Sequence, residues 1–192
     1  MFSQFTSTQI IFAAVAVVVL VVIVVYTYLQ SRKTRTAALR SRFGSEYDRA
    51  VLAHGSSQKA EAKLAGRETR VGTLEIRELG ANERDRFFAE WQTVQSRFVD
   101  HPKAAVTEAD NLIASILQAR GYPRESFEQS AADLSVTYPR VMGGFRGAHA
   151  IAVRPLGSEA STEELRTAMI QFRALFDELI QGKSLQETKS AA

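Results

Sequence analysis

Residues 10–25 read IIFAAVAVVVLVVIVV, and Tyr26, Thr27, Tyr28 and Leu29 follow them. No charged side chain interrupts residues 10–29, and a helix of that length, at about 1.5 Å per residue, spans the ~30 Å hydrocarbon core of a bilayer. In lipid, an isolated segment satisfies its backbone N–H and C=O groups only as a helix. The stretch therefore predicts one transmembrane helix over residues 10–29, with a short N-terminal segment, 1–9, before it.

The flanks of this stretch argue against a cleaved signal peptide and indicate an orientation. Residues 1–9 carry no basic side chain, and Tyr-Thr-Tyr-Leu is not the small-residue site at which signal peptides are cut. The nearby positive charges all follow the stretch, and basic residues beside a span stay in the cytoplasm. We therefore expect the N-terminus outside and the C-terminal domain in the cytoplasm.

The basic cluster itself is the strongest candidate for a binding site in the sequence. It occupies a juxtamembrane segment, residues 30–42, and consists of Arg32, Lys33, Arg35, Arg40 and Arg42. Setting the orientation is one role, and contact with anionic lipid headgroups is the sharper hypothesis. From residue 43 onward the chain has 19 basic and 21 acidic residues. The basic pI is thus local and does not favour nucleic-acid binding.

Beyond the cluster, helical periodicity predicts a mostly α fold: a soluble bundle of about five to seven helices over residues 43–182, then a flexible polar tail, 183–192. Gly44 is a predicted break and Gly55 a predicted helix end, while residues 71–80 fit an extended connector or a short strand. Asn82 is a predicted N-cap. The expected helices are 39–54, 57–70, 82–98, 102–120, 126–135, 141–152 and 161–180.

Few residues in this domain point to chemistry. The chain has no cysteine, and His54, His101 and His149 stand too far apart to form a local metal motif. The acid pairs at 46/48 and 83/85 alternate with arginines, as on solvated helix faces. Gly143, Gly144 and Gly147 lack the lysine and hydroxyl of a phosphate loop, so they favour helix packing. We therefore predict no catalytic residue, no metal ligand and no cofactor.

Five short runs of the chain also carry a resemblance to known sequences. They are Arg42-Phe43-Gly44-Ser45-Glu46-Tyr47-Asp48-Arg49, Arg120-Gly121-Tyr122-Pro123, Ala132-Asp133-Leu134-Ser135-Val136, Tyr138-Pro139 and Ala148-His149-Ala150. Over about residues 40–180 the chain resembles a group of uncharacterised bacterial proteins with one N-terminal span and a helical domain. The resemblance implies a bacterial origin and assigns no site residue. Together with the predicted span and its basic flank, a bacterial origin leads us to expect a protein of the bacterial cytoplasmic (inner) membrane.

Two functions compete. The leading hypothesis is a membrane-anchored helical interaction module that binds another protein or itself, because tethering raises its effective concentration near partners in the membrane. The alternative is a membrane-bound enzyme or small-ligand sensor, whose pocket is assembled from distant residues such as Trp91, Tyr122 and His149, together with arginines. A deep, enclosed polar pocket in the fold favours the alternative, and a filled core with only shallow grooves favours the interaction module.

Overall fold

The computed structural model describes residues 7–155 and 160–182, with only the backbone of residues 7–15, 28, 29, 32 and 35. The predicted tail, residues 183–192, and residues 1–6 of the predicted N-terminal segment lie outside this part of the chain. The chain divides into two compact units, residues 1–41 and 42–192. Among the residues that the structure describes, no helix has the length and apolar content needed to cross a bilayer. Residues 10–15, 28 and 29 of the predicted span are among those without described side chains.

The prediction of a mostly α chain is confirmed for the described residues, which form helices and no strand. The long helix α1 covers Ser7–Phe43 and contains the basic cluster. The described residues of the second unit form seven further helices: α2 Ser45–His54, α3 Ser57–Gly72, α4 Ala81–Arg97, α5 Pro102–Ala119, α6 Phe127–Thr137, α7 Met142–Ala152 and α8 Thr162–Gln181.

Local sequence signals set most of these boundaries. Gly44 breaks the chain between α1 and α2 with a φ of 51°, and Gly55 ends α2 with a φ of 73°. Both angles are left-handed values that glycine adopts without steric cost. Pro102 opens α5, where the missing N–H costs nothing. Ser161 and Glu164 cap α8 reciprocally, as their spacing predicts.

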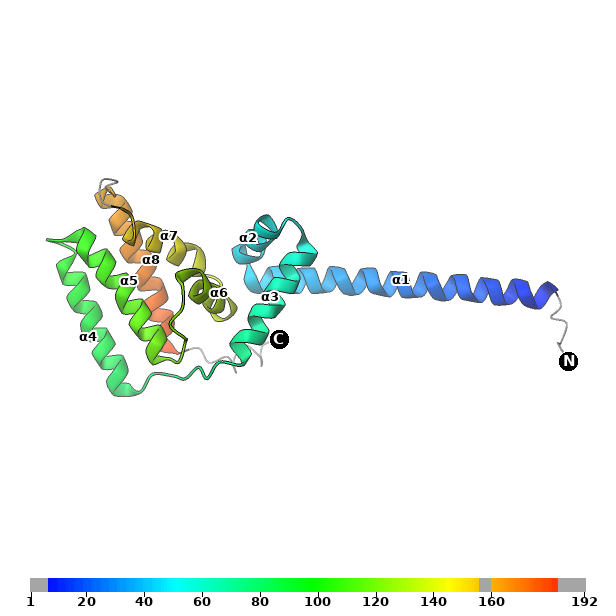
Figure 1. The fold of residues 1–192 in the computed structure, drawn as a ribbon, viewed down its shortest axis with the longest axis horizontal. Helices are drawn as coiled ribbons and strands as arrows, with labels where there is room; N and C mark the ends of the chain where they lie inside the picture. The colour runs from blue at the N-terminus through cyan, green and yellow to red at the C-terminus, as the bar shows by residue number, and fades with distance from the viewer. Residues whose placement is uncertain (1–6, 156–159, 183–192) are drawn as a thin grey trace. The chain divides into compact units, whose positions relative to one another are not determined.

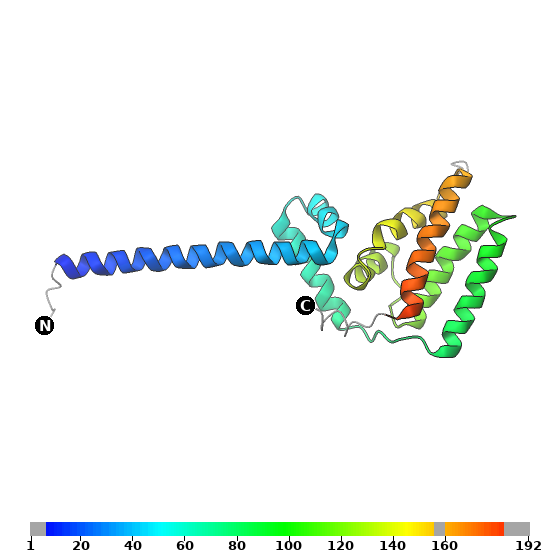
Figure 2. The same ribbon diagram turned by 180° about the vertical axis from the view of Figure 1, so that it is seen from behind.

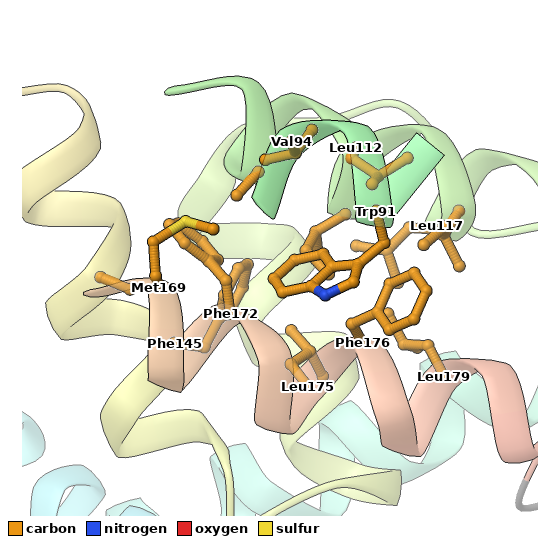
Figure 3. Packing of buried hydrophobic residues seen from close by; sticks show 14 of the residues in the cluster. Trp91, Val94, Leu112, Leu117, Phe145, Met169, Phe172, Leu175, Phe176 and Leu179 are labelled. Atoms are coloured by element: carbon orange, nitrogen blue, oxygen red, sulfur yellow. The ribbon is translucent and has the colours of Figure 1, made fainter. Parts of the chain in front are cut away.

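The second unit is built in layers. Helices α4, α5 and α8 lie side by side, and α6 and α7 lie between them and the α2–α3 hairpin (Figures 1 and 2). Trp91 of α4 is 1% exposed and stacks on Phe176 of α8 with the ring centroids 4.8 Å apart. Figure 3 shows these rings among the aliphatic side chains of α5 and α8. A filled apolar core thus holds α4–α8 together.

Two boundary predictions need correction. Asn82 is not the N-cap of α4, because the helix begins earlier, with Gly80 as its N-cap. Glu83 accepts a hydrogen bond from the Gly80 amide at 2.9 Å and pairs with Arg77, so it fixes the start of the helix. The Arg77 guanidinium and this amide hold the pKa of Glu83 down at about 2. The stretch predicted as 71–80 is an extended connector rather than a strand, and α3 takes its first two residues.

The glycine-rich helix α7 is intact and packs on α8. A Cβ on Gly144 would meet the Gln171 side chain of α8, with Cγ at 3.2 Å and the amide atoms closer still. Nothing lies within 4 Å of such an atom on Gly143 or Gly147. The predicted packing role therefore belongs to Gly144.

Candidate functional site

A cavity of about 400 Å³ opens between α5, the loop 120–126, α6 and α7. We call it the dyad pocket. The α5 wall comes from one helical face, because Asp110, Ala114 and Leu117 recur at spacings of four and three. Helix α7 adds Phe145 and His149, four residues apart. The remaining lining residues are Asn111, Ile113, Ser115, Gln118, Tyr122, Pro123, Arg124, Glu125, Phe127 and Ser130.

Its most specific feature is a histidine–aspartate pair. Nδ1 of His149 lies 3.0 Å from each carboxylate oxygen of Asp110, and both side chains are about one-fifth exposed. A carboxylate at Nδ1 fixes the ring orientation and favours the proton on that nitrogen. Nε2 is therefore the nitrogen left to bind a ligand.

Aromatic side chains hold the imidazole from the other side. The ring of Phe127 stacks on His149 with the centroids 3.6 Å apart and the planes 5° from parallel. Phe145 packs on Phe127 at 5.2 Å and on Phe172 of the core at 6.1 Å. The series of aromatic contacts therefore connects the imidazole, through Phe127 and Phe145, to the apolar core.

The remaining polar groups of the pocket are largely neutral. Asp110 is engaged by His149, and Glu125 accepts a hydrogen bond from Arg70 at 2.7 Å. Arg124 adds a positive charge to the lining, and its neutral polar groups are the amides and hydroxyls of Asn111, Ser115, Gln118, Tyr122 and Ser130. Such a lining suits a flat molecule with an aromatic face and several hydrogen-bonding groups.

The loop under the pocket is fixed by a buried arginine. Arg120 is 1% exposed, donates to the carbonyls of Arg77 and Leu179 at 3.2 Å each, and donates to the hydroxyl of Tyr138. The Leu179 carbonyl is in the last turn of α8, where a cation complements the helix dipole. Burial raises the pKa of neighbouring Tyr122 to about 12, so its phenol stays protonated at neutral pH.

An ion-pair network joins α6 and α7 to the α2–α3 hairpin. Glu46 of α2 is 2% exposed and accepts two hydrogen bonds of 3.3 Å from Arg146 of α7. Asp133 of α6 is 1% exposed and accepts two of 3.2 Å from Arg70 of α3. The prediction of a solvated face around residues 46–48 is therefore wrong for Glu46, whose partner is a hundred residues away.

The predicted basic cluster is only partly described. Lys33 and Arg40 are exposed, and the Arg40 side chain interacts with another group of the protein. The side chains of Arg32 and Arg35 are not among those that the structure describes. Arg42 pairs with Glu68 of α3 at 2.9 Å. Arg42 therefore contributes to the ion pairs of the second unit.

Of the three residues expected to line a hidden pocket, the fold brings two together. Tyr122 and His149 line the dyad pocket, whereas Trp91 borders a separate groove on α4 and α8. Sequence reasoning missed Asp110, which lies 39 residues from His149. No local motif joins the pair. Asp110 does follow the buried Ala109 in an otherwise apolar part of α5, and an acidic residue in such a place is a weak sign that it has a polar partner.

Across residues 7–155 and 160–182, no three histidine, cysteine or acidic side chains gather in a way that would hold a metal ion. The apolar and polar side chains that line the dyad pocket make it a candidate site for an organic ligand. Compared with protein-family models, curated proteins and solved structures, the chain matches none of them.

Proposed function

We propose that this chain is a membrane-anchored helical domain that binds a small, flat, hydrogen-bonding aromatic molecule in the dyad pocket. The observation that carries the proposal is the His149–Asp110 pair stacked on Phe127 at the wall of a 400 Å³ cavity. Cavities of this size suit small organic ligands, and a few fixed polar groups on an apolar wall give orientation.

The dyad pocket is better suited to a sensor or a carrier, which binds a ligand, than to an enzyme. A histidine oriented by aspartate is suited to proton transfer. Catalysis also needs a nucleophile or a stabilising group at a defined distance from the reacting atom. Ser115 lines the pocket, but its hydroxyl donates a 3.0 Å hydrogen bond to the Asn111 carbonyl of its own helix rather than to His149. Binding is therefore the function that the geometry supports best.

The membrane anchor remains part of the proposal. Ten consecutive residues of α1, numbers 17–26, are each at least 50% exposed and all apolar or aromatic. A water-soluble surface rarely carries so large an apolar stretch, and contact with lipid removes it from water. The basic cluster, Arg32 to Arg42, then lies beside inner-leaflet headgroups, and the second unit lies in the bacterial cytoplasm.

Protein interaction, the leading hypothesis from the sequence, stays a prediction. Its support is an apolar groove of about 250 Å³ on α4 and α8, lined in part by Trp91 and Met169, where Ile170 is 60% exposed. Affinity capture from native membranes tests it. Repeated recovery of the bait alone would count against it.

A neutral aromatic amide, indole-3-carboxamide, tests ligand binding directly. Saturation-transfer NMR on the full chain in lipid nanodiscs should show transfer to the indole ring. The Ala114→Phe variant fills the pocket and should abolish it, while the exposed Ala104→Phe on the same helix should not. If Ala114→Phe gave the same saturation transfer to the indole ring as the parent, the probe would bind outside the dyad pocket. That result would reject the proposal that the pocket binds this probe.

A further inference from the structure

A second cavity, of about 850 Å³, runs between α3 and α6, away from the dyad pocket. We call it the lysine groove. Helix α3 presents Lys59, Lys63, Arg67 and Arg70 to it at spacings of four, four and three residues, so the four cations share one helix face. His54 of α2 and Ser126, Glu128, Gln129 and Ala132 from the α6 side complete the lining, together with Ala62 and Gly66.

Lys59 and Lys63 are the exposed cations of the groove. Lys59 and Lys63 form no ion pair within the described ranges, 7–155 and 160–182. The single acidic residue of the lining, Glu128, pairs with Arg146 at 3.0 Å. An anion entering the groove therefore displaces no existing ion pair of either lysine.

Arg67 is the least neutralised arginine beneath them. Three arginines, numbers 67, 70 and 146, surround two buried carboxylates. The Glu46 carboxylate forms an ion pair with Nε of Arg146 at 3.3 Å, and the Asp133 carboxylate forms one with Nε of Arg70 at 3.2 Å. Arg67 lies 3.9 Å from Glu46 and donates a 3.4 Å hydrogen bond to Ser135.

The electrostatics agree with this geometry. Burial, and then the neighbouring charge of Arg146, lower the pKa of Arg67, despite the opposing effect of Glu46. A guanidinium in such a place is destabilised in its charged form, and a bound anion offsets that cost. Two lysines and an arginine along about 12 Å of helix suit the multiple oxygens of phosphate better than a lone carboxylate.

We propose that the lysine groove binds a phosphate-bearing anion, with Arg67 at its floor and Lys59 and Lys63 at its rim. The phosphate comes from a phospholipid headgroup or from a soluble phosphate ester, and the chemistry of recognition is the same. This site is separate from the dyad pocket and from the basic cluster of residues 32–42, so it does not depend on the proposed function.

The absence of native cysteine allows a single reporter in the groove. Ala62 lines the groove and is exposed, so the Ala62→Cys variant of the full chain can be labelled there with an environment-sensitive dye. The labelled protein is placed in phosphatidylcholine nanodiscs. In one arm, inorganic pyrophosphate is added. In the other, phosphatidylglycerol replaces part of the phosphatidylcholine. A saturating response to pyrophosphate indicates a soluble phosphate, and a response to phosphatidylglycerol alone indicates a headgroup.

Removing the two lysine charges in Lys59→Gln/Lys63→Gln should weaken the apparent affinity for the anion about twenty-fivefold, because each basic residue near an anionic surface contributes about a fivefold factor. The double variant Lys103→Gln/Arg140→Gln removes the same charge from positions outside the groove and should respond as the parent does. Equal loss in both variants would show unspecific attraction and overturn the proposal. No response of the parent in either arm would also overturn it.

A second readout does not rely on the dye. Ligand that binds only the folded state raises the thermal midpoint. The anion identified in the first experiment should raise the midpoint of unlabelled parent chain, and this rise should be absent from Lys59→Gln/Lys63→Gln. Because both lysines are exposed, the variant should keep the parent's midpoint without the anion. A rise of the same size in both proteins would exclude the groove as the site.

Discussion

The buried pair of Glu46 and Arg146 gives the sharpest energetic prediction. It joins α2 to α7 through two hydrogen bonds of 3.3 Å, and the two side chains are only 3% and 9% exposed. Replacing either residue with methionine keeps much of the volume and removes one charge. The partner is then left buried without its main counter-ion.

The single variants should each lose roughly 3 to 5 kcal/mol of unfolding free energy, the usual cost of breaking one side of a buried pair. The secondary partners, Arg67 at 3.9 Å from Glu46 and Glu128 at 3.0 Å from Arg146, favour the lower end of that range. The double variant Glu46→Met/Arg146→Met should lie within about 1 kcal/mol of the parent, because an apolar replacement avoids the desolvation of both charges.

Urea unfolding of the full chain in micelles, followed by circular dichroism, measures these values. The control is Glu128→Gln, which removes a carboxylate from the same arginine at a side chain that is 74% exposed. It should cost less than about 1 kcal/mol, as exposed pairs do. Single variants that lose less than the control, or a double variant as unstable as the sum of the singles, would refute the buried-pair account.

Three further predictions concern the fold and the anchor. Gly121→Ala should cost about 3 kcal/mol or more in urea unfolding, because its φ is 93° and a Cβ would clash with the Glu75 carbonyl oxygen; a loss below about 1 kcal/mol would contradict the close approach. Arg154 and the Ser161 amide hold the pKa of Glu164 down at about 2 from an ordinary 4.5, so its stabilisation is complete above pH 4.5 and disappears towards pH 2. Glu164→Gln should therefore be less stable than the parent at pH 7 and equal to it near pH 2 in unfolding series, and parallel pH profiles would disprove this. A cysteine at Ser184 should react with an impermeant maleimide only after cell lysis, and labelling of intact cells would reverse the proposed orientation.

Much of the helical organisation follows from local signals. The break at Gly44, the start at Pro102 and the capping box at Ser161 each act within one helical turn, so the sequence shows them directly. The start of α4 differs from the predicted one because Glu83 bonds the Gly80 amide, and a glycine N-cap has no side chain to reveal it.

The candidate site could not be predicted in the same way. His149 and Asp110 meet across 39 residues, and Glu46 and Arg146 meet across 100. Such contacts depend on how helices pack, and no local spacing encodes them. A charge pattern also fails to separate a buried carboxylate from an exposed one: Glu46 and Asp48 are two residues apart, yet the first is buried and the second exposed.

Mass spectrometry of small molecules that co-purify with the protein tests most directly the central claim, that the dyad pocket binds an aromatic ligand. The full chain, Ala114→Phe and Ala104→Phe are purified from the native membrane in nanodiscs, denatured, and their small-molecule extracts compared by mass spectrometry. The account predicts an aromatic compound that the parent and Ala104→Phe retain in proportion to protein and that Ala114→Phe lacks. Identical extracts from all three proteins, or no retained aromatic compound in any of them, would contradict ligand binding in the dyad pocket.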